Sequence, residues 1–325
     1  MMMERIKLKG TDMEVSRLCM GTMTFGSQTD EKDSKWMVDY CIDSGINFFD
    51  TANNYVDGQS EVFLGKALKE KRKEVIVATK VSNKVGDGPE DQGLSRKAII
   101  KAIDDSLKRL QMDYVDIYYM HQPDRRVSLE ESLGAMDDLM KQGKIRAIGV
   151  SNHSSWEMAQ LLWLAEKNNL TPPVIVQTGY NVLSRSIEVE LLPFCKAFNI
   201  GLAAYNPLAG GMLTGKYKSK ESPADGGRFD NNKRYQERFW NIRNFEAMEE
   251  IEKVAEQEGK TMLSISLQWL WQNDLISTII LGASRKEHLI ENITAAQGRL
   301  KQESVAALNE IWKRLKGFTH DYVKW

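Results

Sequence analysis

Cysteine and histidine are scarce in this sequence, with three cysteines and four histidines among 325 residues. The cysteines, Cys19, Cys41 and Cys195, are odd in number and far apart, so they form neither a disulfide framework nor the paired spacing of a zinc site. With so few histidines, a histidine metal cluster is not expected. We therefore predict a protein without a metal centre and without stabilising disulfides.

Net charge and long apolar runs are also lacking. The 44 lysines and arginines nearly balance the 45 aspartates and glutamates, and a net charge of −1 offers no attraction for nucleic acid or an anionic membrane. No apolar run approaches the roughly 20 residues of a membrane span, and the opening MMMER has no signal-peptide core. We expect a soluble, cytoplasmic protein that binds neither nucleic acid nor a membrane.

Two common nucleotide-binding motifs are missing as well. No predicted strand leads into G-x-G-x-x-G, the fingerprint of a Rossmann domain. Residues 210–217 (GGMLTGKY) match the P-loop pattern G-x-x-x-x-G-K, but Tyr217 stands where a Ser or Thr hydroxyl must bind Mg²⁺. A glycine-rich loop with a lysine can still present backbone N–H groups to a phosphate, so a cofactor contact stays open.

The sequence does have a regular alternation of short apolar runs and amphipathic helical patterns. Eight runs rich in β-branched and aromatic residues begin near Leu18, Ile46, Val75, Tyr114, Ile145, Val174, Ile200 and Thr278. Helices are expected between them at Asp33–Ser44, Ser60–Lys71, Ser95–Leu110, Leu129–Lys141, Ser155–Asn168 and Glu188–Asn199. Ser128 with Glu131 three residues later is typical of a capping box. Such alternation indicates a parallel sheet covered by helices.

Eight βα units over this length favour a closed (β/α)₈ barrel, the TIM barrel, in one domain spanning residues 1–325. Residues 4–16 alternate around a turn at Gly10, which predicts an N-terminal β-hairpin that closes the bottom of the barrel. Beyond the seventh strand we expect a long loop at Ser219–Arg234 and then extra helices at Asn244–Glu258, Met262–Gln272 and from Gln302 onward.

Polar residues end the predicted strands, where the functional site of such a barrel lies. These strand ends carry Asp50, Lys80, His121, Ser151, Asn152, Gln177, Tyr205, Asn206 and residues 282–284 (GAS), and Tyr55 follows Asp50 by five residues. Each residue alone is explained by an ordinary cap, turn or packing role. Four ionisable groups that converge from neighbouring strands on one barrel mouth are a far less common coincidence.

The four ionisable groups can together donate a proton to a carbonyl oxygen. Tyr55 has an ordinary pKa of about 10, and the Lys80 ammonium is expected to lower it. Asp50 can hold Lys80 charged, and His121 can donate a hydrogen bond to the developing negative charge. A hydride donor is missing from this set, which points to a nicotinamide cofactor. An alternative is Schiff-base chemistry on Lys80, which requires a depressed pKa that Asp50 opposes.

Several motifs resemble those of the aldo-keto reductase family. They are GINFFDTANNYVDGQSEVFLGKAL, IVATK, YVDIYYMHQPD, IRAIGVSN, AAYNPLAGGMLTGKY and IILGASRKEHLIENI, and they extend from about Leu8 to Ala296. GLSRKAII and LQMDYVDI are most similar to the branch of potassium-channel β-subunits and related bacterial reductases. The resemblance implies a barrel that binds NADP(H) and reduces aldehydes or ketones. It also implies that Asp50, Tyr55, Lys80 and His121 are the catalytic tetrad, with Tyr55 as the proton donor.

The same resemblance implies a set of cofactor-binding residues. Ser151, Asn152 and Gln177 match those that bind the carboxamide, Tyr205 the aromatic that stacks on the nicotinamide, and Leu208, Gly211 and Lys216 the pyrophosphate loop. Ser284, His288, Glu291 and Asn292 match the adenosine end. The further expected contacts are Gly21, Thr22, Met23, Asn206, Pro207, Leu213, Gly282 and Arg285. His288 departs from the pattern, since the branch of potassium-channel β-subunits more often has Gln here and other branches have Arg. Arg285 and Lys286 can supply positive charge for a 2′-phosphate, so NADPH is preferred over NADH.

Substrate identity is left open by the sequence. The predicted pocket walls are Phe25, Arg125 and Trp240, with further aromatic candidates at Phe229, Tyr235, Phe239, Phe318, Tyr322 and Trp325. The aromatic rings favour an apolar or ring-shaped carbonyl compound, whereas nearby arginines favour a carboxylate or phosphate, namely Arg125, Arg126, Arg228 and Arg234. A second hypothesis for the whole chain is a regulatory protein that senses the NADP⁺/NADPH ratio with little turnover. Oligomeric state is not predicted.

Overall fold

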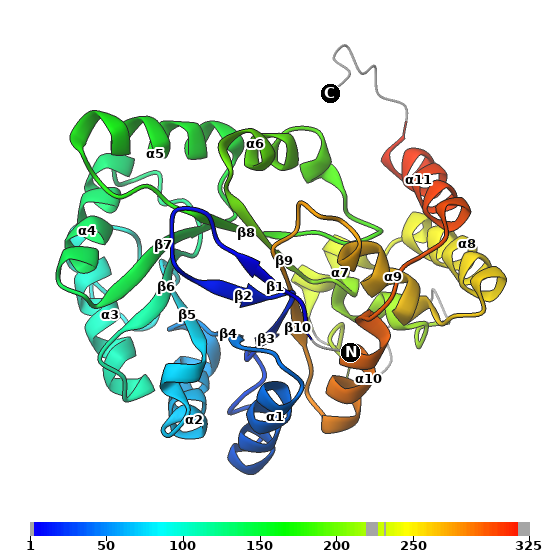
Figure 1. The fold of residues 1–325 in the computed structure, drawn as a ribbon, viewed down its shortest axis with the longest axis horizontal. Coiled ribbons are helices and arrows are strands. Elements are labelled where there is room, and N and C mark those ends of the chain that lie inside the picture. The colour runs from blue at the N-terminus through cyan, green and yellow to red at the C-terminus, as the bar shows by residue number, and fades with distance from the viewer. Residues whose placement is uncertain (1–2, 219–226, 231, 318–325) are drawn as a thin grey trace.

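Eight parallel strands close into a barrel in the computed structural model of the chain, which describes residues 3–218, 227–230 and 232–317 (Figure 1). Around the barrel the strands follow the order β10-β3-β4-β5-β6-β7-β8-β9. They are β3 Leu18–Gly21, β4 Phe48–Asp50, β5 Ile76–Val81, β6 Val115–Met120, β7 Ile145–Ser151, β8 Ile175–Gly179, β9 Gly201–Tyr205 and β10 Thr278–Gly282. The predicted (β/α)₈ barrel is confirmed.

The barrel interior is a separate apolar core, because alternate residues of each strand point inward. Its members are aliphatic, small or aromatic side chains, and they include Cys19, Phe48, Ala78, Ile117, Tyr119, Ala147, Ile175, Ala203 and Ile280. The other face of each strand packs against the surrounding helices in a larger core. Burial on both faces explains why the strand sequences are continuous apolar runs.

An antiparallel hairpin closes the N-terminal end of the barrel, as predicted. It consists of β1 (Arg5–Lys7) and β2 (Glu14–Ser16) and lies across the barrel axis in Figure 1. Leu8, Met13 and Val15 are buried and join the interior core from below. The barrel interior is therefore filled and capped at this end.

Helices surround the barrel and connect consecutive strands (Figure 1). Their bounds are α1 Glu31–Asp43, α2 Gln59–Leu68, α3 Arg96–Leu110, α4 Leu129–Lys141, α5 Ser155–Asn168, α6 Leu191–Phe198, α7 Lys233–Phe239, α8 Ile242–Glu258, α9 Met262–Trp271, α10 Lys286–Ala296 and α11 Gln302–Lys316. At α4 the Ser128 Oγ accepts a hydrogen bond from the Glu131 N–H, at 3.1 Å. The Glu131 carboxylate instead accepts from the Arg96 N–H, so only half of the predicted capping box forms.

The segment between β9 and β10 differs from the prediction. We expected a loop through Arg234, but α7 begins at Lys233 and its cap is Asn232, whose Oδ1 accepts from the Tyr235 N–H at 3.3 Å. The sequence KRYQERF carries little amphipathic signal, and Phe239 alone is buried there. Packing of Phe239 and its neighbours stabilises a helix that local pattern does not predict. Residues 219–226 and 231 of the predicted loop lie outside the described residues.

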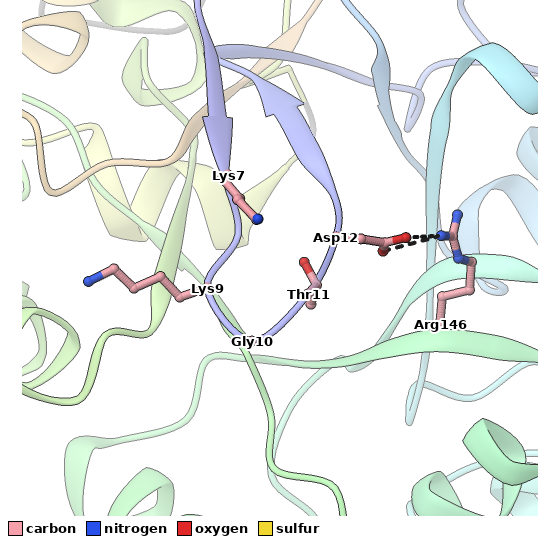
Figure 2. Close-up of a pocket in the computed structure, with 6 residues that line it drawn as sticks. All are labelled: Lys7, Lys9, Gly10, Thr11, Asp12 and Arg146. Atoms are coloured by element: carbon pink, nitrogen blue, oxygen red, sulfur yellow. Dashed lines mark hydrogen bonds and ion pairs between the residues drawn. The ribbon is translucent and has the colours of Figure 1, made fainter.

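A depression of about 780 Å³ lies beside the hairpin, and Figure 2 shows the residues around it. Asp12 and Arg146 form an ion pair there, with 3.1 Å between Nη2 and Oδ2. Arg146 is at the start of β7, whereas the predicted site residue Ser151 is at its end, so this depression lies at the opposite end of the barrel from the predicted site.

Within the described ranges, no helix is long and apolar enough to cross a membrane.

Candidate active site

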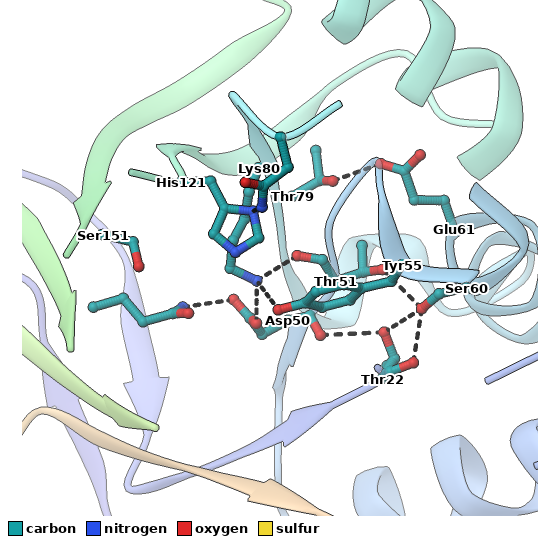
Figure 3. A network of polar contacts seen from close by, with 12 residues as sticks. Thr22, Asp50, Thr51, Tyr55, Ser60, Glu61, Thr79, Lys80, His121 and Ser151 are labelled. Carbon is teal, nitrogen blue, oxygen red and sulfur yellow. Dashed lines mark hydrogen bonds and ion pairs between the residues drawn. The ribbon is translucent and has the colours of Figure 1, made fainter. Parts of the chain in front are cut away.

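Lys80 and Asp50 form a buried ion pair at the C-terminal ends of β5 and β4 (Figure 3). Their side chains are 0% and 3% exposed, and Lys80 Nζ lies 2.5 Å from Asp50 Oδ1. Lys80 also donates to the Thr51 carbonyl at 2.5 Å and to the Tyr55 hydroxyl oxygen at 3.4 Å. The ammonium therefore has a partner for each of its three N–H bonds, which fixes it in place.

Tyr55 begins a turn with unusual backbone geometry. It opens the 3₁₀ helix Tyr55–Gly58, in which Val56, Asp57 and Gly58 have φ of 49°, 51° and 85°. Left-handed backbone is unfavourable for the β-branched Val56, and such strain persists only where the surroundings enforce it. A Cβ at position 58 would lie 2.7 Å from Arg109 Cδ, so the tight packing there requires glycine. The turn positions the phenol against Lys80, with Nζ 4.8 Å from the ring centroid.

The buried carboxylate of Glu61 connects the helix that follows this turn to neighbouring elements. Glu61 on α2 is 0% exposed, and it accepts hydrogen bonds from Thr79 Oγ1 at 2.5 Å and Arg109 Nε at 2.6 Å. These bonds connect α2 to β5 and α3. Figure 3 shows Glu61 and Thr79 beside the tetrad of Asp50, Tyr55, Lys80 and His121. The bonds of Glu61 thereby anchor the helix that follows the Tyr55 turn.

The protonation states of Lys80 and Tyr55 follow from burial and their mutual contacts. Burial alone lowers the pKa of Lys80, but the nearby Asp50 and Tyr55 outweigh it and raise the pKa above its ordinary value. Burial raises the pKa of Tyr55, and the opposing effect of Lys80 does not cancel it. The expected lowering effect of Lys80 on this pKa is present, but burial outweighs it, so the net direction is upward. Both groups stay protonated at neutral pH.

His121 follows the end of β6 and faces Tyr55. The two rings meet edge to face, with centroids 5.9 Å apart and an interplanar angle of 78°. Loss of solvent, together with the charges of Lys80 and Arg234, lowers the pKa of His121 to about 3. The imidazole is therefore neutral at physiological pH and can donate from only one nitrogen.

Asn83 contacts His121 and is absent from the residues that sequence reasoning singled out. Its Nδ2 lies 3.0 Å from His121 Nδ1. Asn83 is half-buried and comes two residues after β5 ends. A polar residue just past a barrel strand is a weak signal, since most such residues only face solvent.

Four of the predicted nicotinamide residues form a connected group beside the tetrad. Ser151 pairs with Gln177 in the register of β7 and β8. Asn152, with a left-handed φ of 59°, donates from Nδ2 to the His121 carbonyl and to Ser151 Oγ, both at 3.0 Å. Its Oδ1 accepts from the Tyr205 hydroxyl at 2.8 Å. The structure brings Ser151, Asn152, Gln177 and Tyr205 together at one side of His121.

The donors and acceptors of this group fit a carboxamide. Gln177 Nε2 donates to Asp50 Oδ2 at 2.8 Å, so the Oε1 atom is the acceptor at the other side of the amide. Ser151 Oγ accepts from Asn152, and within the described chain no acceptor takes its own proton. An acceptor beside a donor is what the N–H₂ and C=O groups of a nicotinamide carboxamide require. The residues present therefore fit a nicotinamide cofactor.

The loop after β9 has the geometry expected of a phosphate-binding segment. Asn206, Ala209, Gly210, Gly211 and Gly215 all have positive φ, between 48° and 99°. A Cβ at Gly211 would lie 3.6 Å from Lys216 Nζ, so glycine there leaves the space beside the ammonium open. In the described residues no carboxylate pairs with this exposed lysine. Leu208 is half-buried, whereas Pro207 and Leu213 are buried and point their side chains into the protein.

The predicted adenosine end lies at β10 and the start of α10. Arg285, His288 and Glu291 are exposed, and Arg285 has no acidic partner among the described residues. Lys286 differs from the expectation, because its Nζ pairs with Asp33 at 2.6 Å and is not free for a phosphate. Asn292 is 5% exposed and donates to the Gly282 carbonyl at 3.3 Å. Ser284 is half-buried and its carbonyl accepts from Thr29.

The three residues expected after the first barrel strand lie beside the tetrad. At Gly21 a Cβ would lie 2.8 Å from Ile280 Cγ2, so only glycine fits between β3 and β10. Thr22 is buried, and its Oγ1 contacts the Asp50 carbonyl at 3.2 Å and Ser60 Oγ at 2.8 Å (Figure 3). Met23 is half-buried.

The predicted pocket walls are scattered. Phe25 is fully buried in the helix-side core, so it packs the protein rather than facing open space. Trp240 packs edge to face against Tyr217 and Phe245, at centroid distances of 5.3 Å and 5.0 Å. The Arg125 side chain is 77% exposed and lies 3.4 Å from Glu157. Phe318, Tyr322 and Trp325 lie outside the described residues.

A closed (β/α)₈ barrel with a Tyr, Lys, Asp and His cluster at its mouth defines the class, and comparison with known sequences identifies the family. The model of the aldo/keto reductase family matches residues 17–313, and the chain belongs to this family. A probable voltage-gated potassium channel subunit beta from Oryza sativa subsp. japonica is 35% identical over 90% of this chain and 91% of its own length. Aflatoxin B1 aldehyde reductase member 2 from Rattus norvegicus is 36% identical over 90% and 83%. The uncharacterized oxidoreductase YrpG of Bacillus subtilis (strain 168) is 34% identical over 99% and 100%.

Proposed function

We propose that this protein is an NADPH-dependent reductase that converts an aldehyde or ketone to an alcohol. The observation that carries the proposal is the contact of Tyr55 with a buried, charged Lys80 beside the neutral His121. Family membership and the oxidoreductase names of its relatives support the reaction class. The chain has the residues for proton donation and for carbonyl polarisation at one barrel mouth.

Tyr55 is the proposed general acid. Its phenol carries a proton at neutral pH, and the Lys80 ammonium opposes the rise in pKa that burial causes, so the phenol can act as an acid toward a carbonyl oxygen. The Lys80 ammonium stabilises the phenolate that remains, and Asp50 keeps that ammonium charged. Proton transfer therefore leaves negative charge beside a fixed positive charge in a dry site, which lowers the barrier.

The nicotinamide supplies a hydride when the cofactor is bound. Ser151, Asn152 and Gln177 would hold its carboxamide, Tyr205 would pack on its ring, and Lys216 would contact the pyrophosphate. Arg285 is the proposed partner of the 2′-phosphate, because it is exposed and Lys286 is already paired with Asp33. A contact between Arg285 and the 2′-phosphate favours NADPH over NADH, which is the weaker alternative.

A second function is supported by the relatives named as potassium-channel subunits. In that case the protein binds NADP(H) and responds to its redox state with little turnover. Schiff-base chemistry on Lys80 is disfavoured, because the ammonium is fully buried and its pKa is raised rather than depressed.

The decisive experiment follows the near-UV absorbance of NADPH when the protein meets an activated aromatic aldehyde, with NADH in parallel. We expect rapid loss with NADPH and slow loss with NADH. Cofactor binding is measured independently from the change in NADPH fluorescence. Binding of NADPH without turnover on any of a panel of aldehydes and ketones would overturn the reductase proposal in favour of the sensing function.

A further inference from the structure

The backbone after β5 is bent in a way that aims Asn83 at His121. Ser82 has a φ of 140°, a conformation that residues with a side chain rarely adopt. Its carbonyl accepts from the Gly93 N–H at 2.7 Å, and its Oγ donates to the Gln122 carbonyl at 3.3 Å. The His121 N–H donates to the Val81 carbonyl at 2.8 Å. These bonds enforce the bend and bind the two loops, which hold Asn83 and His121, to each other.

The contact between Asn83 and His121 has a chemical direction. The Nδ2 atom of an asparagine amide can only donate, and it lies 3.0 Å from His121 Nδ1. A neutral imidazole carries one proton, so Nδ1 is the acceptor and the proton is on Nε2. Because the pKa of His121 is lowered to about 3, the ring is singly protonated near neutral pH, so it is in one tautomer or the other.

We infer that Asn83 is a positioning residue that fixes His121 as the Nε2–H tautomer, so that Nε2 donates a hydrogen bond to the substrate carbonyl oxygen. The inference rests on the proposed reductase function for the identity of the acceptor. The opposite tautomer would present a lone pair to the carbonyl oxygen and repel it. Asn83 thereby acts through His121 and needs no contact with the substrate.

Two substitutions of similar size separate the role of the hydrogen bond from that of shape. Asn83→Leu removes the donor and adds no acceptor. Asn83→Asp replaces the donor by a carboxylate, which accepts from Nδ1–H and so favours the opposite tautomer. Asn168→Leu makes the same amide-to-leucine change at the C-terminal end of α5, where the half-buried Asn168 donates to Glu130 Oε1 at 3.1 Å, and serves as the control.

The first readout is nitrogen-15 NMR of the histidine rings, which does not depend on activity. The signals of His121 are assigned by their loss in His121→Gln, since the chain has only four histidines. We expect the proton on Nε2 in the wild type and in Asn168→Leu, and on Nδ1 in Asn83→Asp. A wild-type ring with its proton on Nδ1 would overturn the inference, and so would an unchanged tautomer in Asn83→Asp.

The second readout is the rate of carbonyl reduction against pH. At neutral pH we expect kcat to fall about 10- to 100-fold in Asn83→Asp and by a smaller factor in Asn83→Leu, as for other residues that orient a functional histidine. In Asn83→Asp we expect the added carboxylate to raise the pKa of His121. The positive charges of Lys80 and Arg234 oppose this rise, because they disfavour protonation of the ring. Asp50 and Tyr55 are the other titratable groups on this side of His121. Part of its activity should return at low pH, where the ring is protonated on both nitrogens.

The two proposals fail in distinguishable ways. A wild-type protein with its proton on Nε2 and no turnover would overturn the reductase function and leave the tautomer assignment standing. Normal turnover in Asn83→Asp with a reversed tautomer would show that His121 does not donate to the substrate. Wild-type kcat and KM in Asn83→Leu and Asn83→Asp, with no new pH dependence, would reject the positioning role of Asn83.

Discussion

The two ends of the proposed cofactor site are built differently. At the tetrad end, Lys80 is fully buried and each of its N–H bonds has a partner within the protein. At the pyrophosphate and adenosine end, Lys216 and Arg285 are exposed and have no carboxylate partner among the described residues. Groups that carry out chemistry are arranged before any ligand binds, because rearrangement during the reaction costs free energy. Groups that bind phosphate keep their hydrogen-bonding capacity for the ligand.

The largest effect in this comparison is expected from Tyr55→Phe. Loss of the general acid should lower the rate of carbonyl reduction by about 10²- to 10⁴-fold. The affinity for NADPH should stay unchanged, because the cofactor contacts come from other strands. Rates are measured by NADPH absorbance and affinity by fluorescence titration. Retention of more than half of the wild-type turnover would reject Tyr55 as the proton donor.

Asp50→Asn should break the tetrad end structurally. It leaves the Lys80 ammonium buried without a countercharge, which is expected to lower the free energy of unfolding by about 3–5 kcal/mol. The matched control is Asp87→Asn, because Asp87 forms an exposed pair with Lys84, with side chains 97% and 62% exposed. That change should cost less than about 1 kcal/mol. Equal denaturation midpoints in urea for both variants would contradict this difference.

At the adenosine end, Arg285→Ala should raise the KM for NADPH by about 10- to 100-fold, since a charge-assisted contact to phosphate is lost. The KM for NADH should barely change. Lys286→Ala is the control, because that ammonium pairs with Asp33. If Lys286→Ala weakened NADPH binding as much as Arg285→Ala, the assignment of the 2′-phosphate contact to Arg285 would be wrong.

Near neutral pH the smallest effect is expected from a change in pH itself. His121 is neutral above about pH 3, so the reduction rate should show no inflection near 6.5, the ordinary pKa of histidine. Its folded pKa lies below its unfolded pKa, so the unfolded chain takes up the proton first. The contribution of His121 to stability is therefore complete above about pH 6.5 and declines toward about pH 3, by at most about 1.4 kcal/mol per pH unit. The decline should be absent in His121→Gln, as urea titrations at several pH values would reveal.

Sequence reasoning located the strands and the residues at their ends, because both are local signals. Lys80, for example, ends a continuous apolar run, and a barrel places all such ends at one mouth. The same reasoning missed α7, whose few buried residues leave little periodicity to detect. For the pKa of Tyr55 it considered only the charge of Lys80, which does lower that pKa, and not the burial of the phenol, which raises it by more.

By itself, the sequence determined the alternation of strands and helices, the closed barrel and the identity of the residues at its mouth, because apolar periodicity and strand ends are properties of short segments. Only the tertiary structure decided which of these residues are paired and which are protonated. Asp33 forms an ion pair with Lys286, and Asn83 contacts the His121 ring. At Tyr55 the effect of burial on the pKa outweighs that of Lys80. Such outcomes depend on contacts between distant segments and on exclusion of water, and local sequence encodes neither.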